Sequence, residues 1–232
     1  MNEKSMNITS VFLSVDGEVN KHGQGNWSVF IRTAGCSARC SYCDTEYSWG
    51  KGTRMNINNI LKQVDELAVG TKKVTITGGE PLEQDSEAMH ELLRRLWQKD
   101  YDVTIETNGL HDMKPFFNHK YRVTFVADYK LSSSGVPADK INIKNFRGLM
   151  PGNFIKFVIA DDKDFLEALT IIREDLAGRT MAKFYFSPCG GKMTGERLFA
   201  MMKDSPCVEL GIGLNLQIHK FLFPGDWRDE EK

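Results

Sequence analysis

The sequence lacks an excess of charge of either sign, and it lacks long apolar runs. Among its 232 residues, 30 are Lys or Arg and 31 are Asp or Glu, which gives a formal net charge of −1. This balance argues against a protein that coats nucleic acid or a membrane surface. No run approaches the ~20 apolar residues of a membrane-spanning helix. Residues 1–5 have no apolar core, so we expect no secretory leader either.

The sequence also shows no internal repeat and no low-complexity linker. Apolar residues make up 41% and charged residues 26% of the chain, as in an ordinary globular protein. A chain of this length can bury one substantial core. We therefore predict a single domain over residues 1–225, followed by an acidic, polar C-terminal tail over residues 226–232.

Cysteine is scarce, and its distribution is uneven. Three of the five cysteines, Cys36, Cys40 and Cys43, lie within eight residues. The odd total and the expected lack of a leader argue against a disulfide framework. Free thiols suit a reducing compartment, so we predict a cytoplasmic protein that binds neither membrane nor nucleic acid.

Three thiolates on one short loop suit an iron–sulfur cluster, because thiolate is the ligand that such clusters take. A cubic [4Fe–4S] cluster has four irons, and no fourth cysteine lies nearby, so one iron would keep an open coordination site. A zinc site completed by His22 or His219 is an alternative, although zinc prefers a closed set of four ligands. Buried apolar cysteines are a second alternative.

Strand-like and helix-like segments alternate along the chain. The predicted strands cover residues 11–15, 29–33, 73–77, 103–106, 123–127, 154–159, 184–186 and 208–216. Apolar residues at helical spacing predict helices over 57–68, 88–97 and 165–176, the first capped by Asn56 or Asn58. This alternation indicates βαβ units and a mainly parallel sheet. About six repeating strands are too few for a closed eight-stranded barrel, so we predict an α/β fold with a partial, open β/α barrel.

Polar residues follow two of these strands, at the carboxyl end of the sheet where functional residues collect in such folds. Residues 77–81, Thr-Gly-Gly-Glu-Pro, follow one strand, and glycines allow the backbone to approach a ligand closely. Glu106 opens a second turn that runs through residue 109. Its carboxylate could reach the ribose hydroxyls of a nucleotide or cap the next helix.

The C-x₃-C-x₂-C spacing, with the Gly-Gly-Glu-Pro turn about one βα unit later, resembles the radical S-adenosylmethionine (SAM) superfamily. Further segments resemble one family within it, the 7-carboxy-7-deazaguanine synthases. These segments span about residues 11–220, and they are 17–18, 30–32, 43–45, 128–135 and 217–220. The resemblance implies a radical SAM type of partial barrel for nearly the whole chain.

The resemblance also implies a role for each matching residue. Cys36, Cys40 and Cys43 would hold a [4Fe–4S] cluster, whose fourth iron binds SAM, and Thr45 would be a ligand of Mg²⁺. The residues expected to contact SAM are Tyr42, Cys43, Asp44, Gly79, Glu80, Glu106, Asp128, Tyr129, Lys130 and Ser187. The residues expected to contact the substrate are Val15, Asp16, Gly17, Glu18, Arg32, Thr77 and His219. Among them Val15, Asp16 and Gly17 would act through backbone groups, and Arg32 would face a carboxylate.

The implied activity is that of a radical SAM lyase in 7-deazapurine (queuosine-type) biosynthesis. The substrate, 6-carboxy-5,6,7,8-tetrahydropterin, would contract its ring to 7-carboxy-7-deazaguanine with loss of ammonia. The resemblance further implies a homodimer and an electron donor such as flavodoxin or ferredoxin.

A rival enzyme class shares the cysteine spacing and the Gly-Gly-Glu-Pro turn, namely the activating enzymes of glycyl-radical proteins. In that class Arg32, Thr45 and residues 217–220 would have no role. Cys189 and Cys207 fit neither pattern, and two lone cysteines are more typical of small buried residues than of a second cluster. Some members of the synthase family end in a proline or a short arginine-containing tail, whereas this chain continues through residues 223–232.

Overall fold

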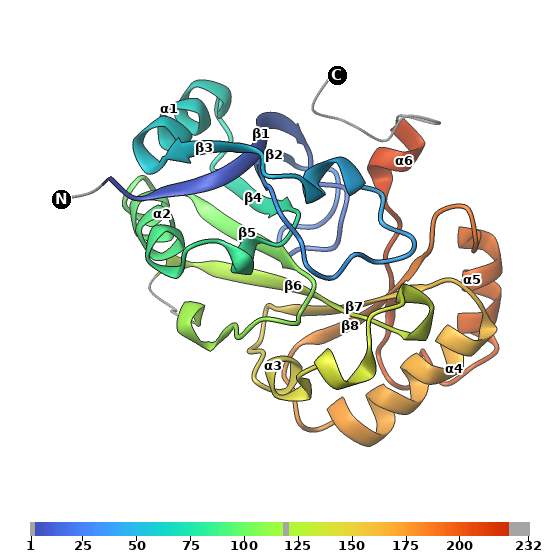
Figure 1. Ribbon diagram of the computed structural model, residues 1–232. Helices are drawn as coiled ribbons and strands as arrows, with labels where there is room; N and C mark the ends of the chain where they lie inside the picture. The colour runs from blue at the N-terminus through green and yellow to red at the C-terminus, as the bar shows by residue number, and fades with distance from the viewer. Residues whose placement is uncertain (1–2, 118–120, 223–232) are drawn as a thin grey trace.

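The computed structural model describes residues 3–117 and 121–222, and it is built on one nine-stranded sheet (Figure 1). The strands are β1 (Ser5–Val15), β2 (Trp27–Thr33), β3 (Thr53–Asn56), β4 (Lys73–Gly78), β5 (Asp102–Thr107), β6 (Val123–Tyr129), β7 (Phe154–Ile159), β8 (Lys183–Pro188) and β9 (Gly213–Leu214). Their order across the sheet is β3-β1-β2-β4-β5-β6-β7-β8-β9. Because β3 and β9 are the two edges of the described sheet, the barrel is open.

Six long strands, β2 and β4 to β8, run parallel to one another and form the centre of the sheet. This confirms the predicted partial barrel. Strand β1 pairs antiparallel with both β2 and β3. The alternation of strands and helices in the sequence does not predict this antiparallel pairing. Most residues at the middle of each parallel strand are buried, as expected where both faces of a parallel sheet are covered.

Most of the helices in the described residues connect successive strands, whereas α6 follows the last described strand. The α-helices are α1 (Ile57–Leu67), α2 (Ser86–Gln98), α3 (Ile143–Arg147), α4 (Asp162–Ile171), α5 (Gly195–Lys203) and α6 (Ile218–Leu222). A π-helical turn, Ile172–Leu176, continues α4. The 3₁₀ turns are Glu46–Trp49, Pro81–Glu83, Lys114–Phe116, Ser132–Ser134 and Ala138–Lys140. Asn56 caps α1 by accepting a hydrogen bond from the Asn59 backbone, at 2.8 Å.

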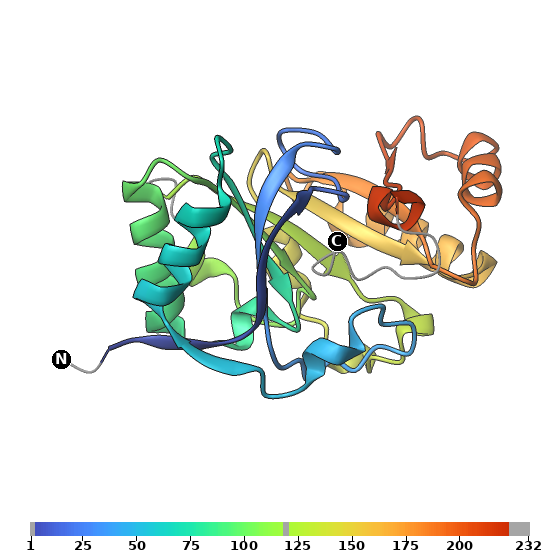
Figure 2. The same cartoon turned by 90° about the horizontal axis from the view of Figure 1, so that it is seen from above.

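The helices pack in two groups, α1 and α2 beside the first half of the sheet and α4 and α5 beside β7 and β8 (Figures 1 and 2). One continuous apolar core fills the space between them and the sheet, with Ile31, Ile76, Ile105 and Phe157 fully buried. This packing leaves the carboxyl ends of the strands to the connecting loops. No helix in the described part of the chain is long and apolar enough to span a membrane.

Two predicted elements differ from the structure. The strand expected over 208–216 is only the two-residue β9, because local turn bonds such as that from Ile212 N to Cys207 O hold the preceding residues. Val208 is consequently 80% exposed. The helix expected over 165–176 is α-helical only to Ile171. The predicted tail, residues 226–232, lies outside the described residues.

Candidate active site

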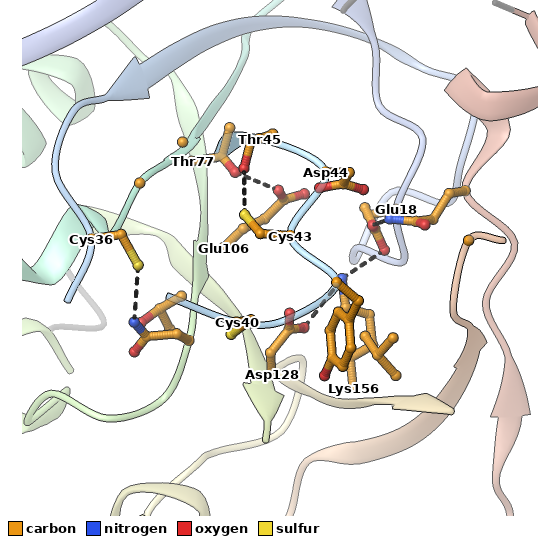
Figure 3. Close-up of a pocket in the computed structure, with 18 of the residues that line it drawn as sticks. Glu18, Cys36, Cys40, Cys43, Asp44, Thr45, Thr77, Glu106, Asp128 and Lys156 are labelled. Carbon is orange, nitrogen blue, oxygen red and sulfur yellow. Dashed lines mark hydrogen bonds and ion pairs between the residues drawn. The ribbon is translucent and has the colours of Figure 1, made fainter. Parts of the chain in front are cut away.

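A pocket opens at the carboxyl ends of the parallel strands, between the sheet and the loop that carries the three cysteines (Figure 3). Arg32, Thr77, Glu106, Asp128 and Lys156 reach it from five neighbouring strands, β2 and β4 to β7. Nearly all of the predicted site residues line it. They are Val15, Gly17, Glu18, Arg32, Cys36, Cys40, Tyr42, Cys43, Asp44, Thr45, Thr77, Gly79, Glu106, Asp128, Lys130 and His219.

The cysteine loop follows β2, and its three thiols all face the pocket. None of them is in a disulfide. The Cys36 sulfur accepts a weak hydrogen bond from Asn108 Nδ2 at 3.8 Å, and the Cys43 sulfur lies 3.6 Å from Thr45 Oγ1. Burial raises the pKa of the Cys36 and Cys40 thiols, so metal binding would have to displace their protons.

Among the described residues, the three cysteine thiols are not placed around one ion. In a cubic cluster each thiolate binds a different iron, whereas the ligands of one zinc ion lie within about 4 Å of each other. No group of three or more His, Cys, Asp or Glu side chains in residues 3–117 and 121–222 is placed to hold one ion. His22 lies instead beside Asp102, at 3.4 Å, and does not line the pocket. The donor set therefore favours iron–sulfur chemistry over the zinc alternative.

The Gly-Gly-Glu-Pro turn fixes the base of the cysteine loop. Gly79 N donates to Thr33 O at 2.9 Å, and Glu80 N donates to Gly35 O at 2.7 Å. A side chain at Gly79 would place its Cβ 2.0 Å from Gly35 O, so only glycine allows the two backbones to approach this closely. The turn thus sets the position of the residue that precedes Cys36.

Glu83 and Ser134 hold the cysteine loop at two further points. Glu83 Oε1 accepts hydrogen bonds from Ser37 N at 2.9 Å and Ser37 Oγ at 2.6 Å, and it lies 3.1 Å from His111 Nε2. On the other side, Ser41 N donates to Ser134 O at 2.9 Å. The three thiols therefore sit on a loop that other turns of the barrel fix in place.

Four of the predicted site residues do not line the pocket: Asp16, Glu80, Tyr129 and Ser187. Glu80 is fully buried and accepts hydrogen bonds from Thr107 Oγ1 at 2.6 Å and Asn108 N at 2.7 Å. Beneath the surface of the pocket, Glu80 therefore connects its own Gly-Gly-Glu-Pro turn after β4 to the turn after β5. Burial raises its pKa, although these hydrogen bonds oppose the rise.

The other three are turned away from the pocket for different reasons. The Tyr129 ring stacks against Phe157 in the apolar core, with centroids 5.3 Å apart. Ser187 is 1% exposed and lies 3.2 Å from Asn215 Nδ2. The backbone N–H and carbonyl of Asp16 both bond within its own loop, to Asn26 and Gly25. Both backbone groups of Asp16 are therefore already hydrogen-bonded within the protein.

A chain of charges, buried except for the partly exposed Asp128, forms the wall of the pocket beside Cys40. Lys156 Nζ lies 2.9 Å from Glu18 Oε2 and 3.1 Å from Asp128 Oδ1, and Lys130 Nζ lies 3.0 Å from Asp128 Oδ2. Burial alone would favour the neutral forms, but the opposite charges outweigh it. The pKa of Lys156 is therefore raised well above its ordinary value, and that of Asp128 is lowered. We name Glu18, Lys156, Asp128 and Lys130 the charged wall.

Glu106 lies beside the charged wall, within reach of the charge of Lys156. Its Oε2 accepts a hydrogen bond from Thr77 Oγ1 at 2.7 Å. Burial raises the pKa of Glu106 to about 8, and the negative charges of Glu18 and Asp16 add to the rise. This hydrogen bond joins Glu106, which is predicted to contact SAM, to Thr77, which is predicted to contact substrate.

The segment over residues 217–220 closes one side of the pocket. Gln217 Nε2 donates to Glu18 Oε1 at 2.6 Å, and Ile218 N donates to Gly17 O at 3.2 Å. Lys220 Nζ forms a 2.8 Å ion pair with Asp44 of the cysteine loop. Burial opposes ionisation of Asp44, but the charge of Lys220 lowers its pKa overall. The segment therefore joins the loop after β1 to the cysteine loop.

Several residues that line the pocket are not among the site residues predicted from the sequence. They are Phe30, Ala38, Trp49, Gly78, Thr107, Asn108, Lys156, Val158, Cys189, Gly190, Gln217 and Lys220. Gln217 and Lys220 lie in a segment that resembles the synthase family, and Asn108 lies in the turn that Glu106 opens, so their positions in the sequence indicate a place in the site. A lone lysine within a predicted strand, such as Lys156, is not indicated in this way.

Comparison with known proteins agrees with this site. The model of the Radical SAM superfamily matches residues 30–160, more than half of the chain. The chain therefore belongs to the radical SAM superfamily, whose signature cysteines and barrel the structure places around one pocket.

More similar relatives define the family more narrowly. The 7-carboxy-7-deazaguanine synthase of Clostridium acetobutylicum is 38% identical over 93% of this chain and 95% of its own length. That of Koribacter versatilis is 32% identical over 98% and 99%. The chain thus belongs to the 7-carboxy-7-deazaguanine synthase family of radical SAM enzymes. The alternative of a glycyl-radical activating enzyme is set aside.

Solved structures agree with the fold. QueE from Escherichia coli superposes with a TM-score of 0.69 at 21% identity, covering 92% of this chain and 94% of that protein. SuiB from Streptococcus suis, bound to its precursor peptide SuiA, gives a TM-score of 0.55 at 16% identity. It covers 80% of this chain but 47% of SuiB. The partial barrel is therefore shared with proteins of different size.

Proposed function

We propose that this pocket converts 6-carboxy-5,6,7,8-tetrahydropterin to 7-carboxy-7-deazaguanine and ammonia. The observation that carries the proposal is that three free thiols, a buried arginine and a chain of largely buried charges line the same cavity. Together they can bind a cluster, a zwitterionic cofactor and a carboxylated heterocycle. The family of the chain supports the same activity.

Cys36, Cys40 and Cys43 would hold the [4Fe–4S] cluster, and SAM would lie between the cysteine loop and the charged wall. When bound, the cluster and SAM supply the radical chemistry that removes a hydrogen atom from the substrate. The carbonyl groups of the turn at Gly79 can accept hydrogen bonds from the methionine amino group of SAM. Asp128 and Lys130 would contact the adenosine part of SAM, and Tyr42 would lie beside its base.

The substrate would lie between Arg32, Thr77 and the loop after β1. Arg32 is 8% exposed, and its guanidinium lies 5.4 Å from the centroid of the Phe12 ring and 5.8 Å from that of Tyr47. Such packing fixes the plane of the guanidinium, which suits bidentate binding of the substrate carboxylate. The backbone of Val15 and Gly17 and the side chain of His219 would complete this side. Held in place, the substrate presents one carbon to the cofactor, and positioning supplies much of the rate.

Glu106 would remain protonated near neutral pH and therefore able to donate a hydrogen bond to the substrate. Its position beside Thr77 supports this role in place of a contact with the SAM ribose. Loss of ammonia requires that a proton reach the departing nitrogen, and a buried neutral carboxyl group is a suitable donor.

Thr45 would contribute its hydroxyl to a Mg²⁺ ion that also binds substrate oxygen, since Mg²⁺ takes oxygen ligands and keeps several waters. We further expect the enzyme to work as a homodimer in the cytoplasm and to receive electrons from a flavodoxin or ferredoxin. Replacing Thr45 with Ala should raise the Mg²⁺ concentration needed for half-maximal turnover. An unchanged requirement would remove Thr45 from the proposed metal site.

The test is turnover by anaerobically reconstituted protein with SAM, Mg²⁺, a reductant and the carboxypterin, followed by chromatography of the product. We expect the deazaguanine and ammonia in equal amounts. A protein that carries a full cluster and cleaves SAM, yet forms no deazaguanine, would overturn the proposal while leaving its superfamily intact.

A further inference from the structure

Lys156 is the residue of the charged wall that touches two carboxylates at once. It lies on β7, its side chain is buried, and its amino group is within 3.1 Å of both Glu18 and Asp128. Figure 3 shows these two contacts as parts of one chain of interactions. No other described residue is recorded in an ion pair with both carboxylates.

Each of these carboxylates belongs to a different half of the pocket. Glu18 lies on the loop after β1, where Asn215 Nδ2 and Gln217 Nε2 each donate to it at 2.6 Å. Asp128 lies at the end of β6, where Lys130 is its second cation. Lys156 therefore connects the side proposed for the pterin with the side proposed for SAM.

This connection has an energetic consequence for ligand binding. Ion pairs already hold these three groups, and a ligand that bonds to Glu18 would further restrain the ammonium group of Lys156 and, through it, Asp128. The second ligand then meets a carboxylate with less remaining motion, so its binding costs less conformational entropy. By thermodynamic linkage the effect is reciprocal, so each ligand tightens the binding of the other by the same factor.

We infer that Lys156 is a positioning residue that couples the binding of SAM to the binding of the pterin. This inference rests on the proposed function, because it takes the two ligands to occupy the two halves of the pocket. A residue that only stabilised the fold would weaken both ligands or neither, and it would leave their mutual effect unchanged.

The experiment measures SAM affinity by calorimetry, with and without the carboxypterin, on protein with an oxidised cluster and no reductant. Under these conditions both ligands bind and neither reacts. We expect the pterin to tighten SAM binding at least ~5-fold in the unaltered protein, the lower end of common coupling factors. In Lys156→Met, which has an apolar side chain of similar length, the factor should fall to within about twofold of unity.

Lys130→Met is the matched control, because it also removes a cation from Asp128 but leaves the Glu18–Lys156 contact in place. It should weaken SAM binding while keeping the coupling factor. Lys156→Arg keeps the charge with a different geometry, so it should show partial coupling and provides a folded variant if Lys156→Met is unstable. A second readout is the number of SAM molecules cleaved per product, which should rise in Lys156→Met.

Equal coupling factors in the unaltered protein and both Lys156 variants would overturn the inference, as would the absence of coupling in the unaltered protein. Both results are separable from failure of the proposed function. If the unaltered protein makes the deazaguanine, the function holds whatever the coupling shows. If it makes none, the function fails first.

Discussion

The two sides of the pocket are built in opposite ways. The cysteine loop carries three thiols within eight consecutive residues, and burial raises the pKa of two of them, Cys36 and Cys40. The charged wall takes Glu18 and Lys156 from positions 138 residues apart (156 − 18), and its charges already neutralise one another. The cysteine loop is therefore a local sequence motif whose thiols await a cofactor. The charged wall instead consists of residues far apart in the sequence, whose charges are paired once the chain has folded.

Because of this difference, substitutions in the cysteine loop should affect activity, whereas substitutions in the charged wall should also affect the stability of the fold. Removing a cysteine should abolish the chemistry and cost the apoprotein little, because the thiol makes few contacts without iron. Removing a charge from the wall should cost the fold as well, because a buried partner loses its counter-ion.

The largest effect is expected for Cys36→Ser. Loss of one thiolate should prevent a stable cluster, so the variant should retain no stoichiometric iron and form no product above background. Iron and sulfide analysis, with an assay of turnover, measures this. Urea unfolding of the apoprotein should be within about 1 kcal/mol of the unaltered chain. A variant that keeps a full cluster would remove Cys36 from the ligand set and break the contrast between the two sides.

The same contrast explains what could be predicted from the sequence. The cysteine loop, the turn at Gly79 and the turn after Glu106 are short motifs next to predicted strands, so their common position follows from the geometry of a parallel sheet. The six parallel strands are rich in β-branched and aromatic residues, and this composition too is a local signal. Strand β3 has four residues and no apolar run, so it could not be predicted. Strand β9 is predicted within residues 208–216, but its length of two residues could not be predicted.

The charged wall could not be predicted for the same reason. A lysine in the middle of an apolar strand, such as Lys156, has no local partner that identifies it. Its two carboxylates are brought to it only by the sheet order, in which β6 is next to β7 and the loop after β1 folds over both. Conversely, Glu80 and Tyr129 stand in motifs but point below the pocket, because sequence position fixes a turn without fixing the direction of each side chain.

The next largest effect is expected on stability, for Glu18→Gln. The change leaves the buried ammonium of Lys156 with one carboxylate fewer, and breaking a buried pair in this way costs about 3 kcal/mol or more. Asp65→Asn is the matched control, since it breaks an exposed 2.8 Å pair with Lys99, which should cost at most about 1 kcal/mol. Urea unfolding of the apoproteins compares the two. If both variants lost the same free energy of unfolding, the Glu18–Lys156 pair would contribute no more to stability than a surface ion pair.

A smaller effect, on the pH dependence of stability, is expected for Glu106. Its ordinary pKa is 4.5 and its folded value is about 8. Between these values the folded chain holds a proton that the unfolded chain has lost, so stability falls as pH rises from 4.5 to 8. In Glu106→Gln this contribution disappears, and the variant should gain on the unaltered chain as pH rises through that range.

Urea unfolding of apoprotein at several pH values between 5 and 9 measures the difference between the two curves. Glu174→Gln, at an exposed position on the π-helical turn, is the control and should run parallel to the unaltered chain. Parallel curves for Glu106→Gln would mean that the group ionises normally, and the proposed proton donor would then be charged at neutral pH.

The smallest effect is expected for the two cysteines outside the loop. Cys207 is 1% exposed and packs in the main core, whereas Cys189 is 2% exposed and reaches the pocket wall. Cys207→Ala should lower the free energy of unfolding by about 1 kcal/mol through a small cavity, and neither Cys207→Ala nor Cys189→Ala should change the iron content. Iron analysis beside urea unfolding tests both. Loss of iron from either variant would mean that a distant residue contributes to the metal site, and the cysteine loop would then no longer be a self-sufficient local motif.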